Sequence, residues 1–262
     1  MAKRIISGIV ALPILFFFVL KGGMVLSLGA FMLSLIGLHE FYRSFRSRDI
    51  KPMAALGYVY TVILYVVLYI SNDISFLLLL MFTMVVAMLF TLVFSTKYTI
   101  EDIAITLLGF MYIPLAFSHI MLITKFELGS VVIWLVFIIA WGSDTFAYFV
   151  GRTFGKRKLI PSVSPNKTVA GSVGGVIASM ILCGTFAYFF MPTYVVYAMV
   201  IGVVGAMISQ IGDLVASKIK RINDIKDFGK LMPGHGGVLD RFDSILMTGP
   251  IVYYFIFFLT KY

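Results

Sequence analysis

The chain consists of successive apolar runs, most of them about 17 to 23 residues long. A helix of roughly 20 residues crosses the ~30 Å hydrocarbon core of a membrane, and at these lengths only helices satisfy the backbone there. Charged residues make up 13% of the sequence, against roughly 25% in soluble domains, which excludes a soluble globular protein. We predict an all-α polytopic membrane protein with about nine transmembrane helices, at residues 5–20, 24–42, 54–71, 75–95, 102–123, 129–150, 169–191, 193–216 and 242–260.

The distribution of basic residues supports this division of the chain. Nine spans place 18 of the 21 Lys and Arg residues on the side of the N-terminus, and leave Lys21, Lys125 and Lys261 on the other. Cytoplasmic loops carry such an excess of Lys and Arg. Merging or dropping one span would spread these basic residues over both sides of the membrane. The one-sided distribution therefore supports nine spans and predicts a cytoplasmic N-terminus.

Two loops of the C-terminal half differ from the rest of the chain. Residues 151–168 and 217–240 are long, basic and rich in Gly, Pro, Ser and Asp, and the predicted topology puts both on the cytoplasmic side. The earlier spans are joined by short loops. We therefore divide the chain into an N-terminal helical region, 1–140, and a C-terminal region, 141–262, that carries the candidate site.

Carboxylates within or beside the apolar runs mark that site, because an ionised side chain in a membrane is costly unless it is paired or hydrated. Asp144 and Asp213 each lie near the inner end of a predicted span. Asp240 and Asp243 are three residues apart and share one face if their segment is helical. Each could form an ion pair with a nearby Lys or Arg. As a set without His or Cys, they favour a hard cation such as Mg²⁺.

Basic and glycine-rich segments accompany these carboxylates. Lys167 follows Pro165, which stiffens the chain before a span and suits a fixed phosphate contact. His235 lies among glycines in Pro-Gly-His-Gly-Gly, where it could contact phosphate or serve the folding of the loop. Residues 151–156 lack the spacing and the Ser or Thr of a nucleotide P-loop. Carboxylates for Mg²⁺ beside fixed cations are typical of phosphoryl or nucleotidyl transfer.

Two blocks of the C-terminal half resemble a known family. The stretch SKIKRINDIKDFGKLMPGHGGVLDRFDS, residues 217–244, resembles the signature of the phosphatidate cytidylyltransferases, also called CDP-diglyceride synthases. That signature reads Ser-x-x-Lys-Arg, Lys-Asp four residues later, Pro-x-His-Gly-Gly and Asp-Arg-x-Asp; Met232 stands where Leu, Ile or Phe is usual. A second similar block is SDTFAYFVGRTFGKRKLIPSVSPNKTVAGSVGG, residues 143–175. The first 140 residues match only as a run of spans.

The resemblance implies a Mg²⁺-dependent nucleotidyltransferase of phospholipid biosynthesis in the cell inner (cytoplasmic) membrane, with its active site facing the cytoplasm. It would convert CTP and phosphatidate into CDP-diacylglycerol and pyrophosphate as a homodimer, with K⁺ as a candidate second cation. By position, the metal centre would be Asp213, Asp240 and Asp243, with Lys167 as a further catalytic residue. The residues expected to bind substrate are Asp144, Lys220, Arg221, Lys226, His235 and Arg241.

Two alternatives stay open. A different CDP-lipid transferase would move a phospho-alcohol onto a CDP-lipid, although the Asp-Gly-x-x-Ala-Arg core of those enzymes is absent here. A membrane transporter of phosphate-containing anions or lipids would use the basic loops as gates. Transporters often show internal repeats or paired broken helices, and the sequence shows no such duplication. Membrane lipid surrounds the chain in every case, and we expect no nucleic-acid partner.

Overall fold

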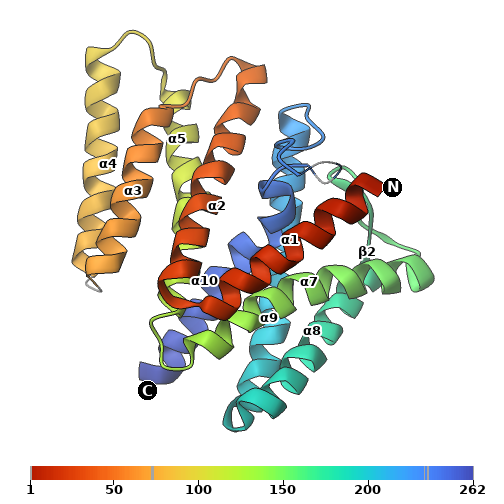
Figure 1. The fold of residues 1–262 in the computed structure, drawn as a ribbon. Helices are drawn as coiled ribbons and strands as arrows, with labels where there is room; N and C mark the ends of the chain where they lie inside the picture. Colours follow the sequence, from red (N-terminus) through yellow and green to blue (C-terminus); the bar gives the residue numbers. More distant parts are fainter. Residues whose placement is uncertain (1, 72–73, 233, 235, 262) are drawn as a thin grey trace.

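Helices form on all the predicted apolar runs (Figure 1). The computed structural model describes residues 2–71, 74–232, 234 and 236–261, with side chains for 12–71, 75–232, 234 and 236–259. The helices are α1 (Ala2–Lys21), α2 (Gly23–Ser44), α3 (Ala54–Ile70), α4 (Ile74–Phe94), α5 (Ile100–Tyr112), α6 (Pro114–Ile123), α7 (Gly129–Phe154), α8 (Val169–Phe190), α9 (Val195–Ile222) and α10 (Leu239–Lys261). Short 3-10 turns η1 (Phe45–Arg48) and η2 (Pro192–Tyr194) follow α2 and α8.

The predicted class, an all-α polytopic membrane protein, is confirmed. Among the described residues, seven helical segments are long and apolar enough to cross a membrane. The described part of α1, Leu12–Lys21, and α3, Ala54–Ile70, are shorter apolar helices. The count of nine spans therefore stays a prediction.

One predicted span, 102–123, consists of two helices. Thr99 caps α5 by accepting a hydrogen bond from Asp102 N, and Asp102 accepts one in return from Thr99 N. The helix ends at Tyr112 and α6 starts at Pro114, which has no N–H to continue the first hydrogen-bond ladder. The two helices together still make one membrane-crossing segment, Ile100–Ile123.

Small residues bring α7, α8 and α9 close together. A Cβ added to Gly171 or Gly175 of α8 would lie 2.5 Å from Ala147 O or 2.7 Å from Ser143 O of α7. A Cβ on Gly202 of α9 would lie 2.8 Å from a backbone oxygen of α8. Such close contacts take the place of the hydrophobic effect in holding membrane helices together.

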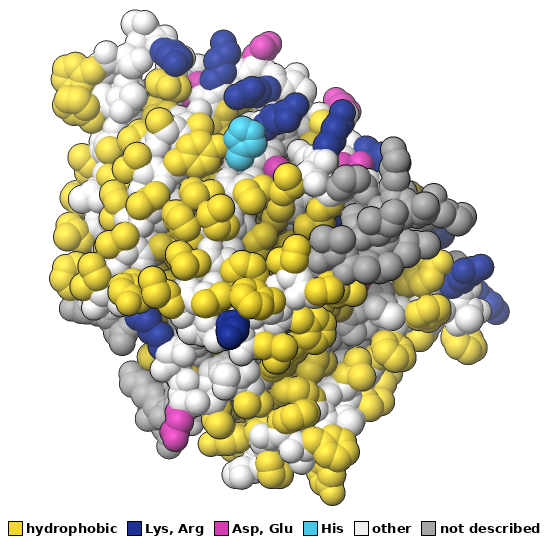
Figure 2. Space-filling model, in the orientation of Figure 1, with side chains coloured by type: hydrophobic (Ala, Val, Ile, Leu, Met, Phe, Trp, Pro, Cys, Tyr) yellow, Lys and Arg dark blue, Asp and Glu magenta, His cyan; other side chains and the backbone are white. Residues whose placement is uncertain are grey.

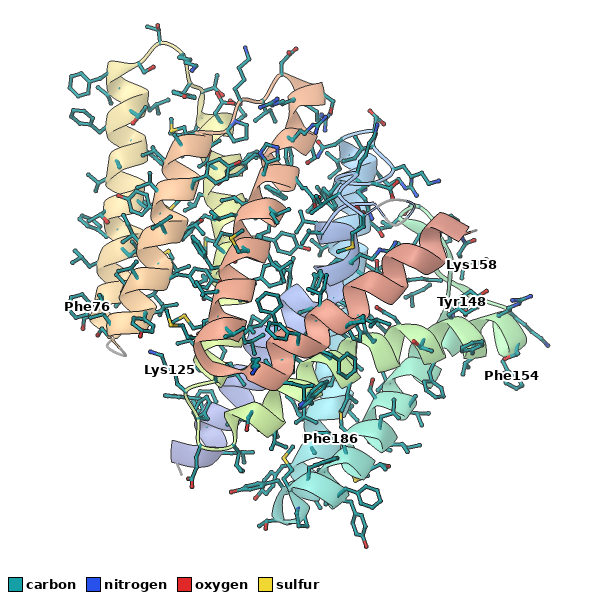
Figure 3. The ribbon with its side chains drawn as sticks, in the orientation of Figure 1. Phe76, Lys125, Tyr148, Phe154, Lys158 and Phe186 are labelled. Carbon is teal, nitrogen blue, oxygen red and sulfur yellow. The ribbon has the colours of Figure 1, made fainter. Side chains whose placement is uncertain are left out.

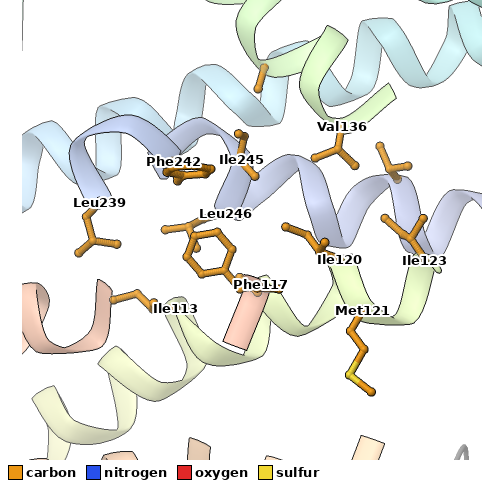
Figure 4. Packing of buried hydrophobic residues seen from close by; sticks show 14 of the residues in the cluster. Ile113, Phe117, Ile120, Met121, Ile123, Val136, Leu239, Phe242, Ile245 and Leu246 are labelled. Atoms are coloured by element: carbon orange, nitrogen blue, oxygen red, sulfur yellow. The ribbon is translucent and has the colours of Figure 1, made fainter. Parts of the chain in front are cut away.

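Helix α10 connects this group of helices to the N-terminal ones. It packs against α7 and α9 on one side and against α6 on the other, and α6 in turn packs on α2. Figure 4 shows Phe117 and Ile120 of α6 against Phe242 and Leu246 of α10. All four are buried. The start of α10, which carries Asp240 and Asp243, is therefore held from both sides.

Many of the charged residues gather at one end of the molecule. Figure 2 shows Lys and Arg side chains along the upper edge in that view, above an extensive apolar surface. On that side the segment between α7 and α8 forms a hairpin in which β1 (Lys158–Ile160) pairs antiparallel with β2 (Ser164–Thr168). The sequence had indicated only a loop there. Lys158 lies on this flank of the molecule, and Lys125 lies far from it (Figure 3).

Candidate active site

A polar cavity of about 740 Å³ lies where α7, α9 and α10 meet the hairpin. Asp144 of α7, Asp213 of α9, and Asp240 and Asp243 at the start of α10 line it, together with Lys167 of β2. The helical start of α10 puts Asp240 and Asp243 on one face, as their spacing predicted. Carboxylates from three separate segments thus converge, at the end of the molecule where the basic side chains gather.

Two of these carboxylates form ion pairs. Lys167 Nζ contacts Asp213 Oδ2, and Lys220 Nζ lies 2.8 Å from Asp240 Oδ1. The other oxygen of Asp240 accepts hydrogen bonds from Phe228 N at 2.8 Å and Gly237 N at 2.9 Å. Asp240 therefore fixes the loop between α9 and α10 as well as facing the cavity.

The other two carboxylates are held by Ser244. Its hydroxyl donates to Asp144 Oδ2 at 3.0 Å and its N–H donates to Asp243 Oδ1 at 2.8 Å. Neither ion pair between described residues includes Asp144 or Asp243. Asp243 is only 8% exposed and lies close enough to Asp213 and Asp144 for their charges to interact. Buried carboxylates that crowd one another are costly unless a cation lies nearby or they bind protons.

Carboxylate oxygens without His or Cys are the kind of donors that a hard divalent cation binds. Among the described residues, no three His, Cys, Asp or Glu side chains are already gathered as a metal-binding group, and Lys ammonium groups lie against Asp213 and Asp240. Still, the cavity offers carboxylate oxygens in excess of its ion pairs, and carboxylate oxygens are the ligands that Mg²⁺ prefers. Asp213, Asp240 and Asp243 remain the predicted metal ligands.

Basic and polar groups from the hairpin and the end of α7 form another part of the wall. Arg152, Lys158 and Asn166 line the cavity, and Figure 3 shows Lys158 on the same flank as Tyr148, another lining residue. Thr168 ends the hairpin and caps α8 by accepting a hydrogen bond from Gly171 N at 3.1 Å. The cavity thus combines acidic groups on three helices with cations on a hairpin.

The glycines of the signature loop allow close packing around Asp240. Gly236 has φ +89°, a left-handed conformation, and a Cβ there would meet Asp240 Oδ2 at 2.7 Å. Met232 N donates to Gly236 O at 2.9 Å, which closes the turn. His235, predicted to bind substrate, lies outside the described residues.

Glu40 of α2 is a site residue that the sequence reasoning missed. It is 5% exposed and accepts hydrogen bonds from Val238 N at 3.0 Å and Leu239 N at 2.9 Å. Its carboxylate therefore caps the N-terminus of α10, where negative charge is stabilising. Gly229 and Gly237 pack so tightly on it that a Cβ at either would overlap the carboxylate. An acidic residue inside an apolar run was the available signal.

Gln210 and Ser172 were missed in the same way. Both line the cavity, and Gln210 is 7% exposed. Ser172 Oγ donates to Gln210 Oε1, and Gln210 Nε2 donates to Ser172 O at 3.1 Å and Ser143 Oγ at 3.3 Å. These bonds tie α7, α8 and α9 together beside Asp213.

Four of the predicted substrate-binding residues are not among the described residues that line the cavity. Lys220 is the ion-pair partner of Asp240. Arg221 and Lys226 are exposed and are not among the described lining residues. Arg241 lines a second, apolar pocket.

Comparison with known proteins agrees with the interpretation of these side chains as a nucleotidyl-transfer site. A model described as the Cytidylyltransferase family matches residues 2–259. The chain belongs to this family. A phosphatidate cytidylyltransferase of Bacillus subtilis is 30% identical over 263 residues, covering 97% of each chain. Phosphatidate cytidylyltransferases of Staphylococcus epidermidis and Staphylococcus aureus are each 33% identical over 258 residues, covering 96% of this chain and 97% of theirs.

The cytidylyltransferase match includes the N-terminal half, where the sequence motifs carried no resemblance beyond a run of spans. Glu40 gives a physical reason for treating both halves as one unit, because this residue of α2 holds the start of the helix that carries Asp240 and Asp243.

Proposed function

We propose that this cytidylyltransferase transfers CMP from CTP to phosphatidate, giving CDP-diacylglycerol and pyrophosphate. The observation that carries the proposal is the single cavity lined by Asp144, Asp213, Asp240 and Asp243 and bordered by the hairpin cations. The similarity to phosphatidate cytidylyltransferases along almost the whole chain supports the choice of substrates. A CDP-lipid product suits a cavity at the end of a membrane helix bundle, where one substrate is soluble and the other is a lipid.

In the reaction, a phosphate oxygen of phosphatidate attacks the α-phosphorus of CTP. The new P–O bond forms as the bond between the α-phosphorus and the bridging oxygen breaks, and pyrophosphate leaves with that oxygen. A phosphate monoester has a second pKa of about 6, so it is largely ionised at neutral pH and needs no general base. Arg152, Lys158 and Lys167 would bind phosphate oxygens and stabilise the charge that develops on the leaving group.

Asp213, Asp240 and Asp243 would hold Mg²⁺, with K⁺ as a candidate second cation beside it. When bound, Mg²⁺ neutralises phosphate charge and orients the reacting groups. Lys167 and Lys220 contact two of these carboxylates, so each ammonium group is placed to move to a phosphate oxygen when a divalent cation occupies the carboxylates.

Removing divalent cations with excess EDTA is expected to lower turnover by at least about 10²-fold, because phosphate charge would then face uncompensated carboxylates. Added Mg²⁺ should restore turnover. Mg²⁺ alone should also raise the melting temperature of the purified protein, as any ligand that binds only the folded state does. Full turnover in EDTA would show that the carboxylates serve another purpose.

The function itself is tested with the purified protein in detergent, supplied with CTP, phosphatidate and Mg²⁺. Formation of CDP-diacylglycerol with one pyrophosphate per lipid is the expected result. Pyrophosphate release without a CDP-lipid would refute the proposed acceptor. Uptake of phosphate-containing anions or lipids by proteoliposomes, without turnover, would favour the transporter alternative.

We propose that the protein lies in the inner membrane of the cell and that its cavity faces the cytoplasm. The excess of basic residues on the side of the N-terminus supports this orientation. Cys183 is the sole cysteine and is 0% exposed, so a Lys156→Cys variant carries one accessible thiol on the hairpin side. In inverted membrane vesicles that thiol should react with an impermeant maleimide, whereas in intact cells it should not. Labelling in intact cells would show that the hairpin side faces the outside of the cell. A homodimer stays a prediction from the family resemblance, to be checked by light scattering.

A further inference from the structure

A second cavity, of about 410 Å³, shares none of its described lining residues with the carboxylate cavity. We call it the α1–α2 pocket. Side chains of α1, α2, α6 and α7 line it, together with Met232 of the signature loop and Arg241 and Phe242 of α10. Helix α1 lies obliquely across α2 and α7, which leaves this space beneath it (Figure 1). Arg241 is the one charged group among the described lining residues.

The α1–α2 pocket runs from the outer surface into the helix bundle. At its outer side, Leu12, Ile14 and Met32 are 48%, 52% and 56% exposed. At its inner side, Ala30 and Ile120 are 2% and 3% exposed. In a membrane the outer residues contact lipid acyl chains, so the pocket is open to the bilayer.

The first turns of α10 separate the two cavities. Asp240 and Asp243 line the carboxylate cavity, whereas Arg241 and Phe242 line the α1–α2 pocket. Successive helical residues point about 100° apart, so Asp240 and Asp243 share one face of α10 while Arg241 and Phe242 between them lie on another. A molecule in the pocket with an anionic group at Arg241 would have that group one residue along the chain from the carboxylates.

We infer that the α1–α2 pocket is the lateral entry site for the lipid substrate, with an acyl chain between α1 and α2 and the phosphate at Arg241. The inference rests on the proposed function for the identity of the lipid. An apolar pocket with a single cation in its described lining matches an amphiphile with a phosphate headgroup, and its volume lies within the range of roughly 300–1,000 Å³ usual for ligand sites. Arg241 and Phe242 belong to the same turns of α10 as Asp240 and Asp243, which favours the reacting phosphatidate over a bystander lipid.

Photo-crosslinking of the intact wild-type protein tests this site directly. The probe is a phosphatidate with a diazirine in one acyl chain, reconstituted in phosphatidylcholine vesicles without CTP. We expect crosslinks to peptides of α1 and α2, displaced by excess unlabelled phosphatidate but not by added phosphatidylcholine. Crosslinks absent from both helices, or displaced equally by either lipid, would overturn the inference and identify the pocket as an ordinary lipid contact.

A pocket-filling variant tests the same site by kinetics. Leu33 lines the pocket on α2, and Leu28 is 51% exposed on the same helix without lining it, so Leu33→Trp and Leu28→Trp form a matched pair. Leu33→Trp should lower the preference for dioleoyl over dihexanoyl phosphatidate about tenfold, the effect of withdrawing roughly two methylene groups from an apolar site. The KM for CTP and the properties of Leu28→Trp should not change. An unchanged chain-length preference in a folded Leu33→Trp protein would contradict the inference.

The two proposals fail in different ways. If the wild-type protein makes no CDP-diacylglycerol, the proposed function is wrong, whatever the crosslinks show. If it turns over phosphatidate but the crosslinks miss α1 and α2, the entry site alone is wrong.

Discussion

Replacing Asp243 by asparagine will lower kcat by about 10²–10³-fold, the usual loss when a charged group that stabilises the reacting phosphates is removed. Asp243 is buried, lines the cavity and accepts a hydrogen bond from Ser244 N. Asparagine keeps the shape and that acceptor but removes the charge. The melting temperature should therefore hold or rise, because Asp213 and Asp144 no longer face a third carboxylate. Steady-state kinetics and a thermal shift assay measure both quantities.

Asp224→Asn is the matched control for Asp243→Asn. Asp224 is exposed, lies outside the cavity lining and has φ +53°, a conformation that asparagine also tolerates. Its kcat should stay within about twofold of wild type, the range expected for a surface substitution of about ±0.5 kcal/mol. Near-normal turnover in Asp243→Asn would remove Asp243 from the catalytic site.

Replacing Glu40 by alanine is expected to destabilise the protein by about 3–5 kcal/mol and to abolish most of its activity. The change leaves Val238 N and Leu239 N buried without an acceptor, each at a cost of about 1–3 kcal/mol, and opens a cavity beneath the signature loop. Since those N–H groups belong to the start of α10, Asp240 and Asp243 would lose their fixed positions. Denaturant unfolding in detergent and the CDP-diacylglycerol assay measure the two effects.

Glu127→Ala separates this effect from a general loss of negative charge, because Glu127 is exposed in the loop between α6 and α7. It should resemble wild type in both assays. Glu40→Gln keeps one acceptor oxygen and should fall between wild type and Glu40→Ala. A stable, active Glu40→Ala protein would show that α10 needs no cap from α2.

Much of the fold could be predicted because membrane helices depend on local composition. Each apolar run became a helix, since lipid leaves the backbone no other partner at these lengths. Helix ends depended on finer features: Pro114 divides one span in two, and α9 continues to Ile222, beyond the predicted end at residue 216. The hairpin at Lys158–Thr168 was not predictable from strands of three and five residues, which are too short to show a period.

The candidate site could be predicted in part. The carboxylates were found because charge in an apolar run is costly, and their convergence followed from their shared position at the inner ends of the spans. The partners of each cation could not be read from the sequence, because they depend on helix packing: Lys220 pairs with Asp240, and Arg241 turns toward the α1–α2 pocket. Glu40 is 198 residues from Val238 in the sequence, so its role emerges only in three dimensions.

The most direct test of the proposed cytidylyltransferase reaction follows the phosphorus atoms of CTP. The purified protein is incubated with phosphatidate, Mg²⁺ and CTP radiolabelled at either the α- or the γ-phosphorus, and lipid is then separated from water-soluble products. Label from the α-phosphorus should appear in the lipid as CDP-diacylglycerol, and label from the γ-phosphorus should remain in water as pyrophosphate. Transfer of the γ-label to lipid, or a lipid fraction free of both labels, would contradict nucleotidyl transfer.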